Sequence, residues 1–199
     1  MFLRQQRAKA KGRPNRCLSD YIAPADSHLE DHLGLFAVTA GLGIEKKLAE
    51  FEAAHDDYRS ILLKALADRL AEAFAEHLHQ RVRREFWAYD SEEALNSDDL
   101  IRERYRGIRP APGYPACPDH SEKEKIFQLL DAPANAGMEL TSGFAMYPAA
   151  SVCGYYFANP RAEYFVLGPV LPDQLEDYSR RRDCSVDEVR LLLPANLHD

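Results

Sequence analysis

The sequence has few of the features that mark secreted, membrane-bound or metal-binding proteins. No apolar run approaches the length of about 18 residues that a transmembrane helix needs, and the first residues lack the apolar core of a secretory signal. The four cysteines stand alone, at positions 17, 117, 153 and 184. No Cys-x-x-Cys pair occurs, which argues against a disulfide framework or a structural zinc site. We therefore expect a protein of the reducing cytoplasm, with no membrane partner and no metal.

The motifs of several enzyme classes are missing as well. There is no glycine-rich phosphate loop, and no serine lies in a nucleophile elbow. His77 and His79 are two positions apart in a predicted helix, so they point to different faces. Cys117 and His120 are close in sequence but lack two further ligands for zinc. From these absences we expect no catalytic residue of these kinds.

The 199 residues are 46% apolar and 29% charged, and the net charge is −7. This length suits one domain, or one and a half, with a hydrophobic core. Residues 1–16 hold six basic groups and no acidic one, so the rest of the chain is strongly acidic. We interpret 1–16 as a basic flexible arm or linker remnant and 17–199 as the folded module. A nucleic-acid-binding tail is the alternative for 1–16, but an acidic body repels phosphate backbones, so we expect no nucleic-acid partner.

Apolar and β-branched runs predict a small antiparallel sheet. Residues 33–40 (LGLFAVTA) stop at a glycine and are typical of a mostly buried strand, and residues 18–23 form a shorter strand candidate that ends at Pro24. Between 140 and 166, three β-type runs are separated by turns that contain proline. This pattern predicts an antiparallel meander.

Residues 45–87 predict one long helix. They contain neither proline nor glycine and are rich in Ala, Leu, Glu and Arg, with a bend expected near 55–58. Steps of three and four place a series of apolar residues on one face, which we expect to enter a core: Leu63, Leu66, Leu70, Phe74, Leu78, Val82 and Phe86. Shorter helices are expected at 97–104, 121–130, 172–181 and 185–193, with Ser97, Ser121 and Ser185 as caps. The predicted fold class is α+β, with a small antiparallel sheet packed with one long helix and several short helices.

The segment 109–118 (RPAPGYPACP) is rigid, because four prolines and a glycine exclude a helix or a central strand. A loop that already holds one shape loses little entropy on binding. Arg109 at its head can bind a carboxylate through two parallel hydrogen bonds. The backbone groups of Ala111 and Gly113 can bind a flat polar edge, and an exposed Tyr114 can stack on a planar group. From the residues alone, a rigid surface loop or a polyproline ligand stays the alternative.

The run RPAPGYPACPDHSEK resembles the S-adenosylmethionine-binding signature of the activation domain of cobalamin-dependent methionine synthase. Further stretches are similar to that domain, from about Leu3 to Leu197: LRQQ, CLSDYIAP, FAVTAGLG, AAHDDYRSILLKALADRLAEAFAEHLH, SGFAMYP, ASVCGYYFANP and DQLEDYSRRR. The resemblance implies a cytoplasmic module of methionine biosynthesis that binds S-adenosylmethionine. It implies a cobalamin-binding domain or subunit as partner, which is reductively methylated, with flavodoxin or a flavoprotein reductase as electron donor.

The resemblance also implies which residues bind. Arg109 is expected to hold the methionine carboxylate, the backbone at Ala111 to contact the adenine or ribose, and Glu72 to lie in the same site. A consecutive aromatic pair that borders the ligand matches Tyr164 and Phe165, where Phe replaces a second Tyr and so lacks a hydroxyl. Two residues are expected to face cobalamin: Tyr114 and Asp68. From spacing alone, an ordinary solvated helix face is the favoured interpretation of the acidic residues at steps of four, Asp68, Glu72 and Glu76.

Three departures from the family limit what we expect of this chain. The family has an upstream helical segment with an aspartate for the ligand's amino group, and residues 17–199 match an activation domain without it. The chain also lacks the Asp-x-His-x-x-Gly cobalamin signature, since Asp26-Ser27-His28 is followed by Asp31 and no glycine, and it lacks a zinc-binding cysteine cluster. We therefore expect a part of a methyltransferase rather than a complete enzyme, with cobalamin supplied by a partner.

Two questions stay open in the sequence. The alternative function is a regulatory or docking module that keeps the fold but does not bind S-adenosylmethionine productively. The oligomeric state is also open, and a homo-oligomer that buries an orphaned face against a second copy is one alternative.

Overall fold

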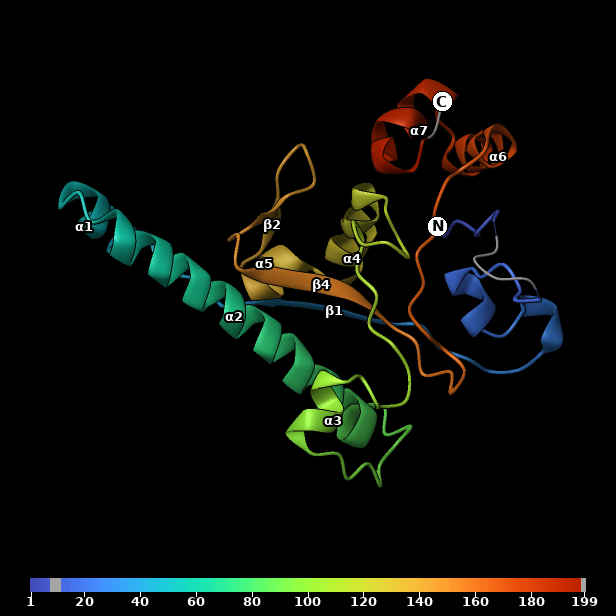
Figure 1. Ribbon diagram of the computed structural model, residues 1–199, viewed down its shortest axis with the longest axis horizontal. Helices are drawn as coiled ribbons and strands as arrows, with labels where there is room; N and C mark the ends of the chain where they lie inside the picture. Colours follow the sequence, from blue (N-terminus) through green and yellow to red (C-terminus); the bar gives the residue numbers. More distant parts are fainter. Residues whose placement is uncertain (8–11, 198–199) are drawn as a thin grey trace. The chain divides into compact units, whose positions relative to one another are not determined.

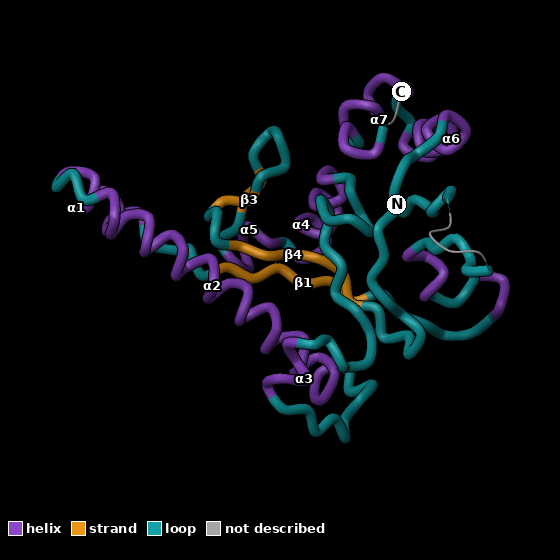
Figure 2. Tube along the Cα trace, viewed as in Figure 1, coloured by secondary structure: helices purple, strands orange, loops and turns teal. Residues whose placement is uncertain are grey.

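The computed structural model describes residues 1–7 and 12–197 (Figure 1). The chain forms two compact units, each built from separate stretches of sequence. The first unit comprises Met1–Gly34, Arg106–Glu122 and Tyr155–Asp199, and the second comprises Leu35–Tyr105 and Lys123–Gly154. Helices of varied length are combined with a few short strands, as Figure 2 shows, so the predicted α+β class is confirmed.

The long helical region of the second unit is interrupted where the sequence predicts a bend. Helix α1 (Glu45–Ala53) ends before His55, whose φ of 53° is left-handed, and α2 (Asp57–Arg81) follows. The Asp56 side chain caps α2 by accepting a hydrogen bond from the Arg59 amide at 3.0 Å. A π-helical turn, η3 (Val82–Phe86), then ends the helix.

The short helices of the second unit are α3 (Ser97–Ile101), α4 (Lys123–Leu130) and α5 (Ala132–Ala136). Helix α3 is shorter than predicted, because Glu103 adopts a left-handed φ of 52°. Its cap is Asn96 rather than Ser97, since the Asn96 side chain accepts a hydrogen bond from the Asp99 amide.

The buried face of α2 differs from the one predicted. The residues that are buried are mostly small: Ser60, Ala67, Ala71, Ala75 and His79. Leu66, Leu70 and Phe74 are 53%, 62% and 47% exposed, so the predicted apolar stripe does not enter a core. Two series of residues repeat at steps of four along this helix, one of leucine and phenylalanine and one of alanine. The small alanine side chains allow the helix to pack more closely against its neighbours.

The strands form two separate two-stranded sheets. Strand β1 (Gly34–Thr39), predicted from the sequence, pairs with β4 (Ser151–Tyr156), and β2 (Glu139–Leu140) pairs antiparallel with β3 (Met146–Tyr147). The predicted meander is therefore wrong. Strand β3 ends at Tyr147, and the next residue, Pro148, has no amide hydrogen for a ladder. The third run, 162–169, forms no strand, and its Leu167 amide donates instead to the Pro115 carbonyl.

In the first unit, short helices replace the predicted strand at 18–23. Residues Leu18–Tyr21 form a 3-10 helix, η1, in which the Asp20 side chain accepts a hydrogen bond from the Cys17 amide. Three further 3-10 turns are η2 (Ala25–Ser27), η4 (His120–Glu122) and η5 (Pro194–Asn196). The α-helices are α6 (Pro172–Arg182) and α7 (Val186–Leu192), and Ser185 caps α7 as predicted.

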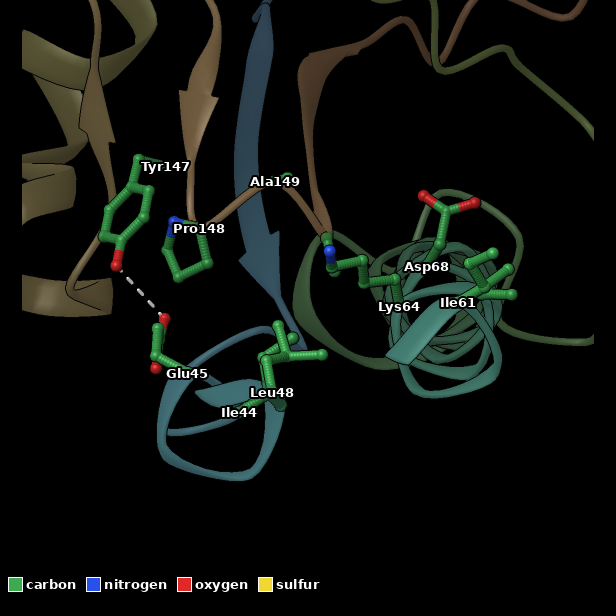
Figure 3. A pocket seen from close by; sticks show the side chains of 11 residues that line it. Ile44, Glu45, Leu48, Ile61, Lys64, Asp68, Tyr147, Pro148 and Ala149 are labelled. Atoms are coloured by element: carbon green, nitrogen blue, oxygen red, sulfur yellow. Dashed lines mark hydrogen bonds between the residues drawn. The ribbon is translucent and has the colours of Figure 1, made fainter. Parts of the chain in front are cut away.

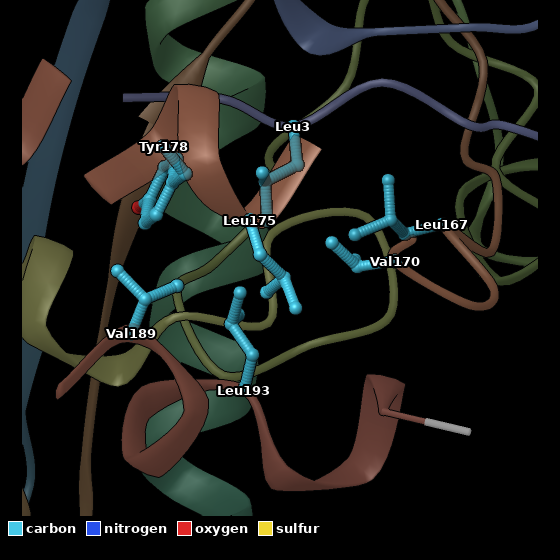
Figure 4. Close-up of a cluster of buried hydrophobic side chains, with 7 residues drawn as sticks. All are labelled: Leu3, Leu167, Val170, Leu175, Tyr178, Val189 and Leu193. Atoms are coloured by element: carbon cyan, nitrogen blue, oxygen red, sulfur yellow. The ribbon is translucent and has the colours of Figure 1, made fainter. Parts of the chain in front are cut away.

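A hydrophobic core joins α6 and α7 to distant parts of the first unit. It contains buried residues from the N-terminus, from the segment before α6, from both helices and from the position after α7 (Figure 4): Leu3, Leu167, Val170, Leu175, Tyr178, Val189 and Leu193. Leu3 is only 3% exposed, and the Gln5 side chain donates to the Val166 carbonyl at 2.7 Å. Residues 1–7 therefore pack into the unit, in contrast to the flexible arm predicted for them. Residues 8–11 of that arm lie outside the described residues, and the division at residue 16 stays a prediction.

Candidate ligand-binding site

The segment 109–118 is anchored at its start by backbone hydrogen bonds within the first unit. Ile108 and Phe157 exchange two bonds, of 3.1 and 3.0 Å, in an antiparallel bridge. The Tyr155 amide then donates to the Pro110 carbonyl at 3.0 Å. Proline has no amide hydrogen, but its carbonyl can still accept, so this proline-rich segment is fixed through its carbonyl oxygens.

Two tight turns close the middle of the loop on itself. The Tyr114 amide donates to the Ala111 carbonyl at 3.3 Å, and the Cys117 amide donates to the Tyr114 carbonyl at 2.9 Å. The Gly113 amide donates to the Cys117 carbonyl at 2.7 Å. These bonds confirm the irregular, braced conformation that the prolines predict.

Arg109 is held beside one of the predicted aromatic residues. Its backbone amide donates to the hydroxyl oxygen of Tyr164 at 3.0 Å. The next residue, Phe165, is buried at 8% exposure, whereas Tyr164 is 38% exposed. Phe165 therefore acts by packing. Because it has no hydroxyl, its burial places no polar group in the interior. In the same loop, the Tyr114 side chain is 58% exposed, which leaves its ring accessible.

The predicted acidic residues lie in the second unit, one turn apart on α2. Asp68 is exposed and accepts a hydrogen bond from Arg69 at 2.8 Å, while Glu72 is half-buried. The hydrogen bond to Asp68 raises the pKa of Arg69 above its ordinary value. Asp68 and Glu72 thus share the helix that the spacing predicts, and their association with Arg109 stays a prediction.

A buried charge cluster follows the loop directly. Asp119 and Glu122 are 2% and 1% exposed, and both accept hydrogen bonds from the guanidinium of Arg182 on α6, at 3.0 and 2.9 Å. Asp119 also accepts from the Tyr178 hydroxyl at 2.7 Å, and burial, reinforced by this carboxylate, raises the pKa of Tyr178. Because Tyr178 belongs to the hydrophobic core drawn in Figure 4, the cluster holds the end of the loop to that core. We call this cluster of Asp119, Glu122 and Arg182 the Arg182 brace.

Sequence reasoning missed this cluster. Ser121 was expected to cap a helix with Glu124, but its hydroxyl donates to Asp119 at 2.6 Å. Acidic and basic runs on either side, PDHSEK and DYSRRR, are the signal in the sequence, but their pairing across 63 positions is not encoded in any local pattern. The pairing emerges only once α6 packs on the core.

Cysteine and metal chemistry have little support in the described part of the chain. Burial raises the pKa of the Cys117 thiol to about 12, so at neutral pH it is protonated and a poor nucleophile. Within residues 1–7 and 12–197, no group of three His, Cys, Asp or Glu side chains is arranged to hold a metal ion. Over the same residues, no helix has both the length and the apolar character needed to span a membrane.

The second unit contains a pocket of about 550 Å³ between α1, α2 and the turn that follows β3 (Figure 3). Its lining is mostly apolar, with polar groups at the edge: Ile44, Glu45, Leu48, Ile61, Lys64, Ala65, Asp68, Tyr147, Pro148, Ala149 and Ala150. The Tyr147 hydroxyl donates to the Glu45 carboxylate at 3.2 Å. The pocket therefore includes Asp68, one of the two residues expected to face cobalamin.

Together, the α+β fold and the braced loop, in which Arg109 lies beside an aromatic side chain, have the features expected of a small ligand-binding module. The chain matches the model of the family described as the vitamin B12 dependent methionine synthase, activation domain, over residues 1–183, and it belongs to that family. The resemblance found in the sequence is thereby confirmed.

A solved structure supports the same relationship. The chain is similar to the crystal structure of the MetH reactivation domain bound to AdoHcy, with 53% sequence identity and a TM-score of 0.96. The match covers 100% of this chain and 61% of that one, so this chain spans about three fifths of the length of that relative.

Proposed function

We propose that this chain binds S-adenosylmethionine through the loop 109–118 and serves in the reactivation of a cobalamin-dependent methionine synthase. The family supports this role, and so does the similar domain that was solved with AdoHcy, which is the methyl donor after loss of its methyl group. The observation that carries the proposal is the hydrogen bond from the Arg109 amide to Tyr164, since it fixes the head of the loop beside an aromatic side chain.

The residues present fit such a ligand. Arg109 is half-buried, so its guanidinium can bind a carboxylate with less competition from water. The loop bonds described above leave the Ala111 amide without a backbone partner among the described residues, so this amide can bind the edge of the adenine. Tyr164 supplies a stacking surface, while the buried Phe165 contributes by packing. Glu72 is proposed to contribute negative charge that favours the sulfonium.

The protein's part in methyl transfer is positioning. When a partner presents cobalamin, its reduced cobalt supplies the methyl acceptor. The donor's sulfonium leaves as a neutral thioether, so no side chain has to move a proton. Tyr114 and Asp68 are both exposed, as residues that face a partner must be. We propose further that flavodoxin or a flavoprotein reductase supplies the electron and that the process takes place in the cytoplasm.

Calorimetric titration of S-adenosylmethionine tests this function. We expect binding by the wild-type chain and a loss of about 10- to 150-fold in affinity for Arg109→Ala, since a hydrogen-bonded charge is removed. Arg180→Ala is the matched control, because Arg180 is an exposed arginine of the same unit that pairs only with Asp177 among the described residues. Absence of binding by the wild-type chain would favour the docking module instead. Equal affinity for Arg109→Ala would contradict the assigned site.

A further inference from the structure

The end of the long helical region contains a buried cation that the function proposed above does not use. Arg83 is fully buried in the π-helical turn η3, where its Nη2 donates to Glu93 at 2.9 Å. Within residues 1–7 and 12–197, its Nη1 forms no hydrogen bond. A buried ion pair typically adds little stability over apolar residues of the same volume, and π-helical turns are frequent at functional positions. The arrangement is therefore typical of a place where the position of a side chain matters more than stability.

Tyr105 is the side chain that this region holds in position. The Arg83 guanidinium lies 4.2 Å from the centroid of the Tyr105 ring, and the His79 ring meets it edge to face with centroids 5.0 Å apart. His79 is itself fully buried, and its Nε2 lies 3.2 Å from the Tyr89 hydroxyl. Two directional contacts from one end of the long helix therefore fix the place and the tilt of the Tyr105 ring.

Tyr105 is also the last residue of the second unit before the segment that leads into the loop 109–118. Three positions later, Ile108 exchanges two backbone hydrogen bonds with Phe157 in the first unit. Between them, Gly107 has a φ of 83°, a conformation that favours glycine. Successive Cα atoms lie about 3.8 Å apart, so this connection spans at most about 11 Å. Such a short connection passes the position of Tyr105 on to Arg109, the residue after Ile108.

The helix that holds Tyr105 also carries Glu72, seven positions before His79. At 1.5 Å per residue, the two lie about 10 Å apart along one continuous helix. Under the proposed function, Arg109 binds the carboxylate of the methyl donor and Glu72 favours its sulfonium. Both residues must then be set for one ligand molecule, and the chain from Tyr105 to Arg109 is a direct covalent connection between their supports.

We propose that Tyr105 is a positioning residue for the methyl donor: its contacts with Arg83 and His79 set the place of Arg109 with respect to Glu72. This inference rests on the proposed function, which it deepens by adding a residue that touches no ligand. It has a specific consequence, because AdoHcy lacks the positive charge of the sulfonium and so depends on Arg109 but not on Glu72. Displacing Tyr105 should therefore weaken the binding of S-adenosylmethionine more than that of AdoHcy.

The test compares the two ligands in calorimetric titrations of each variant. The quantity measured is the affinity ratio, the association constant of S-adenosylmethionine divided by that of AdoHcy. Tyr105→Leu removes both ring contacts and should lower the affinity ratio about fivefold, the effect of losing one favourable charge interaction. Tyr105→Phe keeps the ring and should retain most of the ratio. Tyr58→Leu is the matched control, since Tyr58 lies on α2 and is 75% exposed, and it should leave the ratio unchanged.

Two further variants separate positioning from a general loss of structure. Glu72→Gln should lower the affinity ratio as Tyr105→Leu does, and the double variant should lower it no further, because both changes remove the same interaction. Gly107→Ala strains the connection without removing a core side chain, so it should lower the ratio even if Tyr105→Leu does not fold.

Three outcomes would overturn the inference. Equal weakening of both ligands by Tyr105→Leu would show a merely structural role, and a wild-type ratio in Gly107→Ala would show that the connection does not position Arg109. Additive losses in the double variant would show that Tyr105 and Glu72 act separately. An unchanged ratio in Glu72→Gln would instead contradict the role proposed for Glu72, and the inference would fail with it.

Discussion

The imidazole of His120 lies against Gly113, in the space that a side chain at position 113 would need. A Cβ built on Gly113 would come within 2.2 Å of His120 Cε1, and the φ of Gly113 is 94°, a conformation that favours glycine. Since His120 follows the loop and Gly113 lies at its centre, this contact ties the middle of the loop to its end. Glycine is therefore required at position 113 for two reasons: the positive φ, and the lack of space for a Cβ beside the His120 ring.

Gly113→Ala should therefore weaken S-adenosylmethionine binding by moving the loop. We expect the double variant Gly113→Ala/His120→Ala to recover only part of the affinity, because it removes the clash with the ring but keeps the backbone strain of about 1–2 kcal/mol. The four affinities, measured by calorimetry, form a double-mutant cycle. Wild-type affinity for Gly113→Ala would show that the loop does not depend on this contact.

The Arg182 brace should be necessary for the stability of the first unit. Arg182→Met leaves Asp119 and Glu122 buried without their shared guanidinium, and breaking a buried pair in this way typically costs about 3–5 kcal/mol of unfolding free energy. Urea unfolding measures the loss. Arg180→Met, at an exposed position on the same helix, should change stability by less than about 0.5 kcal/mol. Equal stability of the two variants would contradict the brace.

The loop could be predicted from the sequence because its constraints are local. Four prolines and a glycine exclude regular structure whatever surrounds them, and Arg109 and Tyr114 lie within that segment. The bend before α2 and the cap at Ser185 are local in the same sense, and both are confirmed.

The features that the sequence analysis predicted wrongly, or did not predict, depend on contacts between distant parts of the chain. Periodicity placed Leu70 and Phe74 in a core, yet tertiary packing selected the alanine face of α2. The Arg182–Asp119 pair joins residues far apart in sequence, and no local pattern specifies it. The run at 162–169 has the composition of a strand, but its Leu167 amide bonds to the Pro115 carbonyl of the loop.

A buried ion pair near the end of the long helix should stabilise the second unit. Arg83 is fully buried in η3, and its Nη2 donates to Glu93 at 2.9 Å while its guanidinium lies 4.2 Å from the ring centroid of Tyr105. Glu93→Gln removes the compensating charge, so we expect a loss of about 3–5 kcal/mol in unfolding free energy. Glu92→Gln, at the exposed neighbouring position, is the control. The double variant Arg83→Met/Glu93→Leu should regain most of the loss, since no unpaired charge remains.

Above pH 9 the stability of the protein should fall, in part because of Cys153. This thiol is 1% exposed in β4, and burial raises its pKa from 9.0 to about 12. Above pH 9 the unfolded chain releases the thiol proton while the folded chain keeps it. The stabilisation is therefore complete below pH 9 and is lost progressively between pH 9 and about 12.

Urea unfolding at pH 8 and pH 10 measures this contribution. Cys153→Ala lacks the titrating group, so its unfolding free energy should decline between these two pH values by about 1.4 kcal/mol less than that of the wild type. For each protein, only the change in unfolding free energy between pH 8 and pH 10 is compared, because the substitution also changes packing. An unchanged decline in Cys153→Ala would show that this thiol ionises in the folded protein as readily as in the unfolded chain.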